Sequence, residues 1–155
     1  MRHILAAFLA FAGLVQTGLV HTGMAEAGTI SKLSAHDAAT TFARLEQAVS
    51  KAGATIFARI DHAKGATSVG SAMRPTLTLI FGNPKIGTPI MQDAQRAGLD
   101  LPLRVLVYED ADGQVHLTYA DPMDLVADHG VELGNPALKM MAGALDKLTG
   151  AAAAE

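Results

Sequence analysis

The chain has 155 residues, a formal net charge of −3 and no cysteine. The lack of cysteine excludes disulfide bonds and thiol chemistry. Lys and Arg residues are scattered singly, without the basic run or patch that a nucleic-acid-binding surface needs.

The N-terminus is typical of a secretory signal. Arg2 and His3 precede an apolar run over 4–15, and Ala25-Glu26-Ala27 provides small residues two apart, the pattern a signal peptidase recognises. The apolar run is shorter than the roughly 20 residues that a membrane-spanning helix requires. We therefore expect cleavage and a periplasmic or secreted protein, and an uncleaved membrane anchor is the alternative.

These features divide the chain into three parts. We assign residues 1–27 to the signal peptide, 28–150 to a single domain, and 151–155 to a disordered tail. The domain is long enough to bury roughly two-thirds of its unfolded surface without covalent cross-links. The tail consists of four alanines and a glutamate, a low-complexity end that we expect to fray.

Hydrophobic periodicity and turn residues predict the elements of the domain. In chain order they are a strand over 29–33, a helix opened by Ser34-x-x-Asp37 and ended by Gly53, a strand over 55–61, a Gly/Ala/Ser-rich loop over 62–75, a strand over 76–81, a helix over 88–97, strands beginning at 103 and 115, and helices beginning at 121 and 136. In the strand over 55–61, alternation predicts that Ile56, Ala58 and Ile60 face the core.

The register of one hairpin follows from its loop. If Ala111-Asp112-Gly113 forms a three-residue loop with glycine last, Val107 lies opposite Leu117. The residues Val105, Val107, Val115, Leu117 and Tyr119 then share one face, whereas a two-residue loop would put half of them on the wrong side. The element order therefore predicts an α+β fold, with a mostly antiparallel sheet and helices packed on one face.

Several sequence blocks resemble one known family. The matching blocks are Phe57-Ala58-Arg59-Ile60-Asp61-His62-Ala63, Gly70 with Arg74-Pro75-Thr76, the stretch from Ile80 to Pro89, Asp100-Leu101-Pro102-Leu103, Glu109-Asp110-x-Asp112-Gly113 and Tyr119-x-Asp121-Pro122. Over residues 41–131 the chain is similar to the family called domain of unknown function 302. The resemblance implies a β-α-β4-α fold grouped with TATA-binding-protein-like domains, and it implies no established substrate or cofactor.

The first candidate ligand-binding cluster is Asp61, His62 and Arg74. In an antiparallel meander these residues belong to the same end of the sheet, where Asp61 could orient His62 and Arg74 could hold an anionic group. The alternative is a structural ion pair between Asp61 and Arg74 that closes the loop over 62–75.

The second candidate cluster lies at the opposite end of the sheet. It consists of Asn83, Thr88, Asp100 and Tyr119, whose simpler interpretation is the building of proline-containing corners. We expect no metal site, because His62 and His116 would be about 14 Å apart across three strand spacings. We expect no cofactor either, because the sequence contains no phosphate loop or dinucleotide fingerprint.

Two classes of function fit these observations. The first is an exported, non-catalytic module that binds a small ligand or a protein. Its partner candidates are a small anion, another protein or a second copy of the chain, with no nucleic acid and, after signal cleavage, no membrane. The second class is a small enzyme or metal-dependent protein that uses Asp61, His62 and Arg74.

Overall fold

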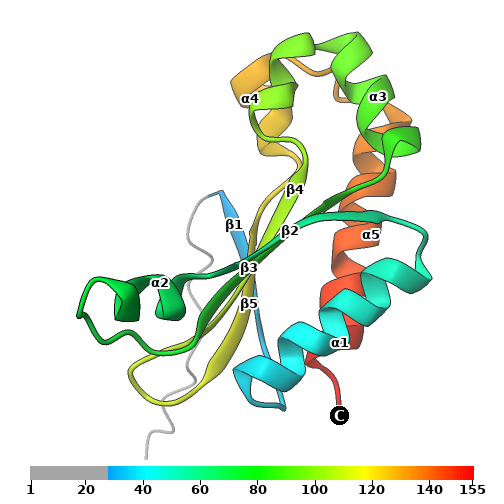
Figure 1. Cartoon of the computed structure of the whole chain (residues 1–155). Coiled ribbons are helices and arrows are strands. Elements are labelled where there is room, and N and C mark those ends of the chain that lie inside the picture. The colour runs from blue at the N-terminus through cyan, green and yellow to red at the C-terminus, as the bar shows by residue number, and fades with distance from the viewer. Residues whose placement is uncertain (1–27) are drawn as a thin grey trace, which may run out of the picture.

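An antiparallel sheet and the helices that cover one of its faces form the two layers of the domain (Figure 1). The computed structural model describes residues 28–155, so the predicted signal peptide over 1–27 lies outside the described residues. The elements are β1 (Thr29–Leu33), α1 (Ala38–Lys51), β2 (Thr55–Asp61), α2 (His62–Ser68), β3 (Thr76–Gly82), α3 (Pro84–Asp93), the 3₁₀ helix η1 (Gln95–Leu99), β4 (Leu103–Glu109), β5 (Val115–Ala120), α4 (Asp124–His129) and α5 (Pro136–Ala153).

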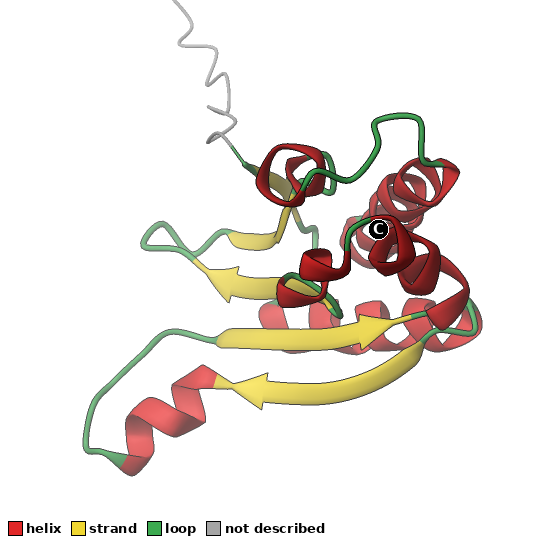
Figure 2. Ribbon diagram, turned by 90° about the horizontal axis from the view of Figure 1, so that it is seen from above, coloured by secondary structure: helices red, strands yellow, loops and turns green. Residues whose placement is uncertain are grey.

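The strands lie in the order β1-β5-β4-β3-β2, and each neighbouring pair is antiparallel. Helices α1 and α5 pack against each other on the same side of this sheet (Figures 1 and 2). The predicted α+β class, its element order and the placing of the main helices on one face are therefore confirmed.

The core lies between the sheet and these two helices. Alternate residues of the central strands, including Leu79, Val107 and Leu117, have no exposed surface. They meet buried side chains at helical spacing, such as Leu45 of α1 and Leu145 of α5. Burial of these apolar side chains supplies the main driving force for folding.

The hairpin between β4 and β5 has the predicted register. Val107 lies opposite Leu117, and Asp110 N donates to Gln114 O at 2.9 Å. Gly113 has a φ of 77°, a left-handed conformation that glycine adopts without a steric penalty. The three-residue loop thus sets which face of both strands is buried.

Strand β2 differs from the prediction because it contains a β-bulge. Its pairing with β3 shifts between Ile56 and Ala58, which leaves Phe57 as the extra residue. Beyond the bulge the faces are exchanged. Arg59 lies opposite Leu79 on the helix side and pairs with Glu46 of α1, so the prediction that Ala58 and Ile60 face the core is wrong.

Two connections are also more helical than predicted. The segment expected to be a loop over 62–75 begins with α2, whose N-terminus is capped by Asp61 and which projects beyond the sheet (Figure 2). Helix α3 begins at Pro84 rather than at residue 88, because Asn83 caps it and a proline is well suited to the first helical position. It ends at Asp93, and η1 follows as a separate turn.

The predicted disordered tail is wrong for most of its length. Helix α5 continues to Ala153, and Ala152 and Ala153 are buried. Arg44 of α1 donates to the carbonyls of Ala151 and Ala154, and Ala35 N donates to Ala153 O at 2.9 Å. The end of α5 is therefore held by contacts with α1 and with the segment after β1.

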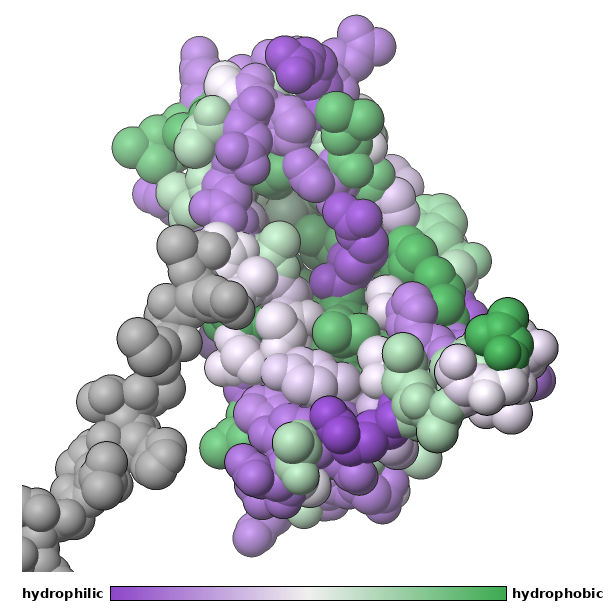
Figure 3. Space-filling view, turned by 90° about the vertical axis from the view of Figure 1, so that its left-hand side faces the viewer, coloured by the Kyte–Doolittle hydropathy of each residue, from purple (hydrophilic) through white to green (hydrophobic). Residues whose placement is uncertain are grey.

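The sheet face opposite α1 and α5 carries a mixture of residue types. Figure 3 views the molecule from this side and shows hydrophobic, weakly polar and charged residues interspersed over it. Tyr108 stacks on His116 there with ring centroids 5.0 Å apart, and Ser31 and Thr118 share a hydrogen bond of 2.8 Å.

Candidate functional site

The first predicted cluster does not assemble into one site. Asp61 accepts a hydrogen bond from Lys64 N at 2.8 Å and thereby caps α2. His62 Nε2 lies 3.0 Å from Thr78 Oγ1, and Arg74 Nε donates to the backbone oxygen of Glu109 at 3.1 Å. Among the described residues no ion pair joins Arg74 to Asp61, so the alternative of a loop-closing ion pair is wrong as well.

Arg74 instead borders a shallow hollow of about 240 Å³. The residues around it are Met73, Arg74, Thr76, Leu106, Tyr108 and Glu109. Nearby, His116 Nε2 lies 2.7 Å from Asp110 Oδ2. The hydrogen bond from His116, reinforced by the backbone N–H groups of Gln114 and Asp112, holds the pKa of Asp110 below its usual value.

The expectation about metal ions concerned His62 and His116. We expected these two histidines to be three strand spacings apart and so unable to share a metal ion. The strand order agrees with that spacing, because β3 and β4 lie between β2 and β5. In the described part of the chain, no group of three or more His, Asp or Glu side chains has an arrangement that could hold a metal ion.

The second predicted cluster is divided between different surroundings. Asn83 and Thr88 both line a large cavity. Asp100 instead contacts Arg104 Nη2 at 3.3 Å and His129 Nε2 at 2.6 Å. Tyr119 is only 4% exposed, because alternation along β5 directs it to the core face together with Leu117.

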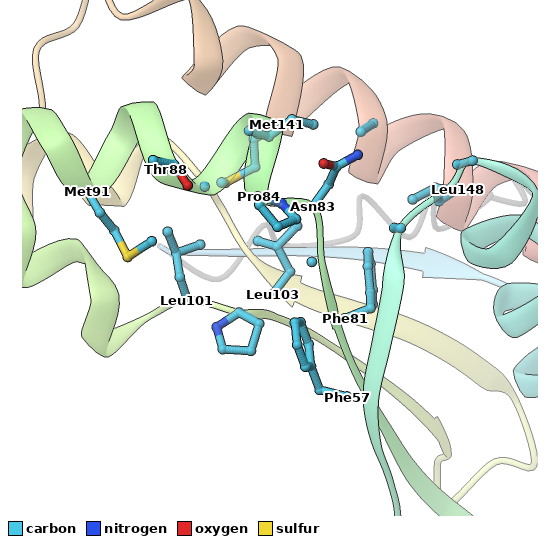
Figure 4. Close-up of a pocket in the computed structure, with 17 residues that line it drawn as sticks. Phe57, Phe81, Asn83, Pro84, Thr88, Met91, Leu101, Leu103, Met141 and Leu148 are labelled. Carbon is cyan, nitrogen blue, oxygen red and sulfur yellow. The ribbon is translucent and has the colours of Figure 1, made fainter.

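This cavity has a volume of about 410 Å³ and lies where the sheet meets α3 and α5 (Figure 4). It is framed by residues from the segment before β2 and from β2 itself, the end of β3, the first turns of α3, the corner before β4 and one face of α5. The lining residues are Ala52, Ala54, Phe57, Phe81, Gly82, Asn83, Pro84, Ile86, Gly87, Thr88, Met91, Leu101, Pro102, Leu103, Met141, Ala144 and Leu148.

Local sequence explains how the corner of the cavity is built. Gly82-Asn83-Pro84 ends β3, because proline has no N–H for the ladder, and Asn83 Oδ1 then accepts from Lys85 N at 3.0 Å to start α3. The second corner contains a cis Leu101–Pro102 bond and begins β4. The two proline corners thus set α3 beside the ends of β3 and β4.

The bulge in β2 places an aromatic ring at the cavity. Phe57 is 59% exposed although it lines the cavity. A Cβ atom at Gly82 would lie 3.4 Å from Phe57 Cε2 and 3.4 Å from Pro102 Cβ, so glycine keeps the space between these two rings open. Phe57 is therefore a partly exposed wall of the cavity.

The lining is almost entirely apolar and contains no Asp, Glu, His, Lys or Arg. Asn83 and Thr88 are its polar side chains. Such a surface offers no acid, base or nucleophile of ordinary reactivity, and it favours apolar molecules because they lose contact with water on entering. Its size falls within the range of about 300–1,000 Å³ that is usual for small-molecule sites.

Sequence reasoning missed most of this site. Phe57, Met91 and Leu148 gave no signal of their own, and Met141 belongs to the buried core as well as to the lining. The sequence indications were the candidates Asn83 and Thr88 and the small residues Gly82 and Gly87 beside them. Small residues leave space only when larger ones surround them, and that depends on the tertiary structure.

Comparison with known families and structures supports the fold. The family described as "Domain of unknown function DUF302" matches residues 30–148. A crystal structure of an uncharacterized conserved protein DUF302 from Bacillus stearothermophilus superimposes with a TM-score of 0.65 at 20% sequence identity, covering 83% of this chain and 97% of that one.

Two curated relatives come from Brucella. The chain is 40% identical over 117 residues to a protein named fluoride-specific ion channel FluC 1 of Brucella suis biovar 1 (strain 1330), and equally identical to FluC 1 of Brucella abortus biovar 1 (strain 9-941). The match covers 75% of this chain in both cases, but only 46% and 43% of the relatives. The chain therefore spans less than half the length of these proteins. In the part that the structure describes, no helix is long and apolar enough to cross a membrane.

Proposed function

Since the chain belongs to the DUF302 family, whose description names no activity, we propose from its cavity that it is a non-catalytic module that binds a small apolar molecule. The observation that carries the proposal is an apolar cavity of about 410 Å³ between the sheet, α3 and α5. The alternative of an enzyme based on Asp61, His62 and Arg74 has less support, because each of these side chains has a separate partner.

Export from the cytoplasm is part of the same proposal. It is supported by the N-terminal apolar run and by Ala25-Glu26-Ala27. A periplasmic or secreted module would meet its ligand outside the cytoplasm. A homodimer or another protein partner is compatible with this function.

Binding of a neutral fluorescent dye, N-phenyl-1-naphthylamine, tests the proposal directly. Ala144 of α5 lines the cavity, so Ala144→Leu adds a branched side chain inside it. We expect the parent to bind the dye and Ala144→Leu to weaken binding more than tenfold. Ala39→Leu is the matched control, because Ala39 is an exposed residue of α1 outside the lining.

Two results would contradict the proposal. One is a parent protein that binds no dye over the soluble range of dye concentration. The other is equal binding by the parent and by a correctly folded Ala144→Leu variant, which would place the dye elsewhere. Circular dichroism and a denaturant titration of each variant establish that the fold is retained.

The Brucella relatives favour a second candidate function. Because both are named fluoride-specific ion channels and share 40% identity with this chain over 117 residues, the chain can be proposed as an accessory module of a fluoride channel. Deleting its gene should then lower the fluoride concentration that the cell tolerates, and restoring the gene should reverse this. Identical growth of the deletion strain and its parent over a fluoride series would count against this role.

A further inference from the structure

The polar groups around the cavity restrict the class of ligand, and this inference rests on the proposed binding function. A charged ligand would need a charged side chain or free backbone N–H groups in the cavity. The lining contains no charged residue. Burying an isolated charge without a partner is strongly unfavourable.

The N-terminus of α3 does not compensate for this lack of charge. Pro84 has no N–H group, and Lys85 N already donates to Asn83 Oδ1 at 3.0 Å. The N–H groups of Ile86 and Gly87 both donate to Asn83 O at 2.9 Å. The first turn of α3 therefore has no free donor for a carboxylate or phosphate, although helix N-termini commonly bind such groups.

Two neutral donors do remain at the cavity. Asn83 uses its Oδ1 atom for the helix cap, which leaves the two protons of Nδ2. Among the described residues, neither Asn83 Nδ2 nor the Thr88 hydroxyl donates a hydrogen bond to the protein. Figure 4 shows both residues on the α3 side of an otherwise apolar space.

From this combination we infer that the cavity takes a neutral, mainly hydrocarbon molecule with one hydrogen-bond acceptor, such as an ester, ketone or amide. The hydrocarbon part lies against Phe81, Leu103 and Leu148, and the acceptor meets Asn83 Nδ2 or the Thr88 hydroxyl. An uncharged acceptor satisfies these donors without bringing a charge into an apolar space.

The volume and the walls suit a chain or a small ring system. An apolar cavity of about 150 Å³ is enough to hold a benzene molecule, so this cavity of about 410 Å³ holds a considerably larger hydrocarbon group. Met91 and Met141 contribute flexible thioether side chains to the walls. Such walls can adapt to chains of somewhat different shape.

The test compares three probes that differ in their polar end. The affinity of each is measured at pH 7 by its displacement of N-phenyl-1-naphthylamine, with the full chain as the cell processes it. Methyl octanoate has a neutral acceptor, octanoate has a charged one, and n-octane has none. Because a carboxyl group of pKa about 4–5 must lose its charge to enter, we expect octanoate to bind about 100- to 1,000-fold more weakly than methyl octanoate at pH 7.

Two variants test the donors. Asn83→Asp keeps the oxygen that caps α3 but replaces the amide donor, and aspartate caps helices as well as asparagine does. Thr88→Val removes the hydroxyl and nearly preserves the shape of the side chain. We expect one or both variants to bind methyl octanoate about 3- to 10-fold more weakly, the usual effect of one hydrogen bond. The n-octane affinity should stay unchanged in Thr88→Val, which adds no charge to the cavity.

Each outcome separates this inference from the binding function itself. If octanoate binds as tightly as methyl octanoate, or if neither variant weakens methyl octanoate, the ligand class is wrong, while the effect of Ala144→Leu on dye binding still supports the binding module. If the parent binds no dye, both fail. A change of oligomeric state in Ala144→Leu without any change in dye binding would identify a second copy of the chain as the occupant and would overturn the inference.

Discussion

Leu79→Ala is expected to destabilise the protein strongly, because Leu79 occupies the centre of the core. It lies in β3, between Arg59 of β2 and Val105 of β4, and none of its surface is exposed. The substitution removes three carbon atoms, which cost about 0.8 kcal/mol each in lost burial. That gives about 2.4 kcal/mol before the effect of the cavity is included.

The cavity left behind adds to this cost. A residual void of about 50–100 Å³, at about 24 cal/mol per Å³, contributes roughly 1–2.5 kcal/mol if the neighbouring side chains do not collapse into it. We therefore expect the free energy of unfolding to fall by about 3–5 kcal/mol. Strands on both sides of Leu79 limit such collapse, which favours the upper half of this range.

The assay is equilibrium unfolding in urea, followed by circular dichroism, with Leu99→Ala as the matched control. Leu99 is 73% exposed, so its truncation should change the free energy of unfolding by no more than about 0.5 kcal/mol. An unchanged dependence on urea concentration would show that both variants unfold as the parent does. If Leu79→Ala cost less than 1 kcal/mol, the assigned register of β3 and its place in the core would be refuted.

Three further predictions concern charge, the C-terminus and processing. Hydrogen bonds from Thr40, His116 and Lys32 lower the folded-state pKa values of Asp37, Asp110 and Asp146, respectively. These carboxylates therefore stabilise the fold above the unfolded-state pKa of about 3.9, and the stabilisation is lost as the pH falls through the lower folded-state pKa values. The urea concentration at the unfolding midpoint should decrease when the pH is lowered below about 4, and this decrease should be smaller in Asp110→Asn. An equal decrease in both proteins would show that the contacts of Asp110 do not contribute. Ala152→Asp should lower the free energy of unfolding by more than about 2 kcal/mol, because Ala152 is buried. Ala151→Asp changes an exposed position and should alter the free energy of unfolding little. Similar effects of the two substitutions would mean that the end of α5 is not packed. Intact-mass measurement of exported protein should give a mature chain that starts near Gly28, and a membrane-bound species that retains residues 1–27 would disprove cleavage.

The sequence by itself determined the fold class and much of the register. The three-residue loop that ends with Gly113 placed Val107 opposite Leu117, and the structure has this pairing and buries both residues. These inferences succeeded because the side-chain period of a strand and the turn preference of glycine act over a few residues. The match to the DUF302 family covers residues 30–148, which include the local blocks that carried the resemblance.

Errors occurred where a local pattern was overridden by a neighbour in space. The bulge at Phe57 exchanges the faces of β2, so that Arg59 meets Glu46 of α1 although alternation alone placed Ala58 and Ile60 toward the core. The alanines at the end of α5 resemble a frayed tail by composition, yet Arg44 and the segment after β1 hold them in place. In each case the deciding contact comes from a residue far away in the sequence.

Most of the candidate site was decided by the tertiary structure, since only Asn83 and Thr88 of its lining were candidates from the sequence. The residues chosen from the sequence for their charge, Asp61, His62 and Arg74, are close in the chain or in the sheet but have separate partners. The cavity instead forms where β2, β3, α3 and α5 meet, and most of its lining consists of residue types that ordinarily fill a core. An apolar side chain has the same appearance in a sequence whether it faces another side chain or an open space, because only the packing of distant elements determines which of the two is present.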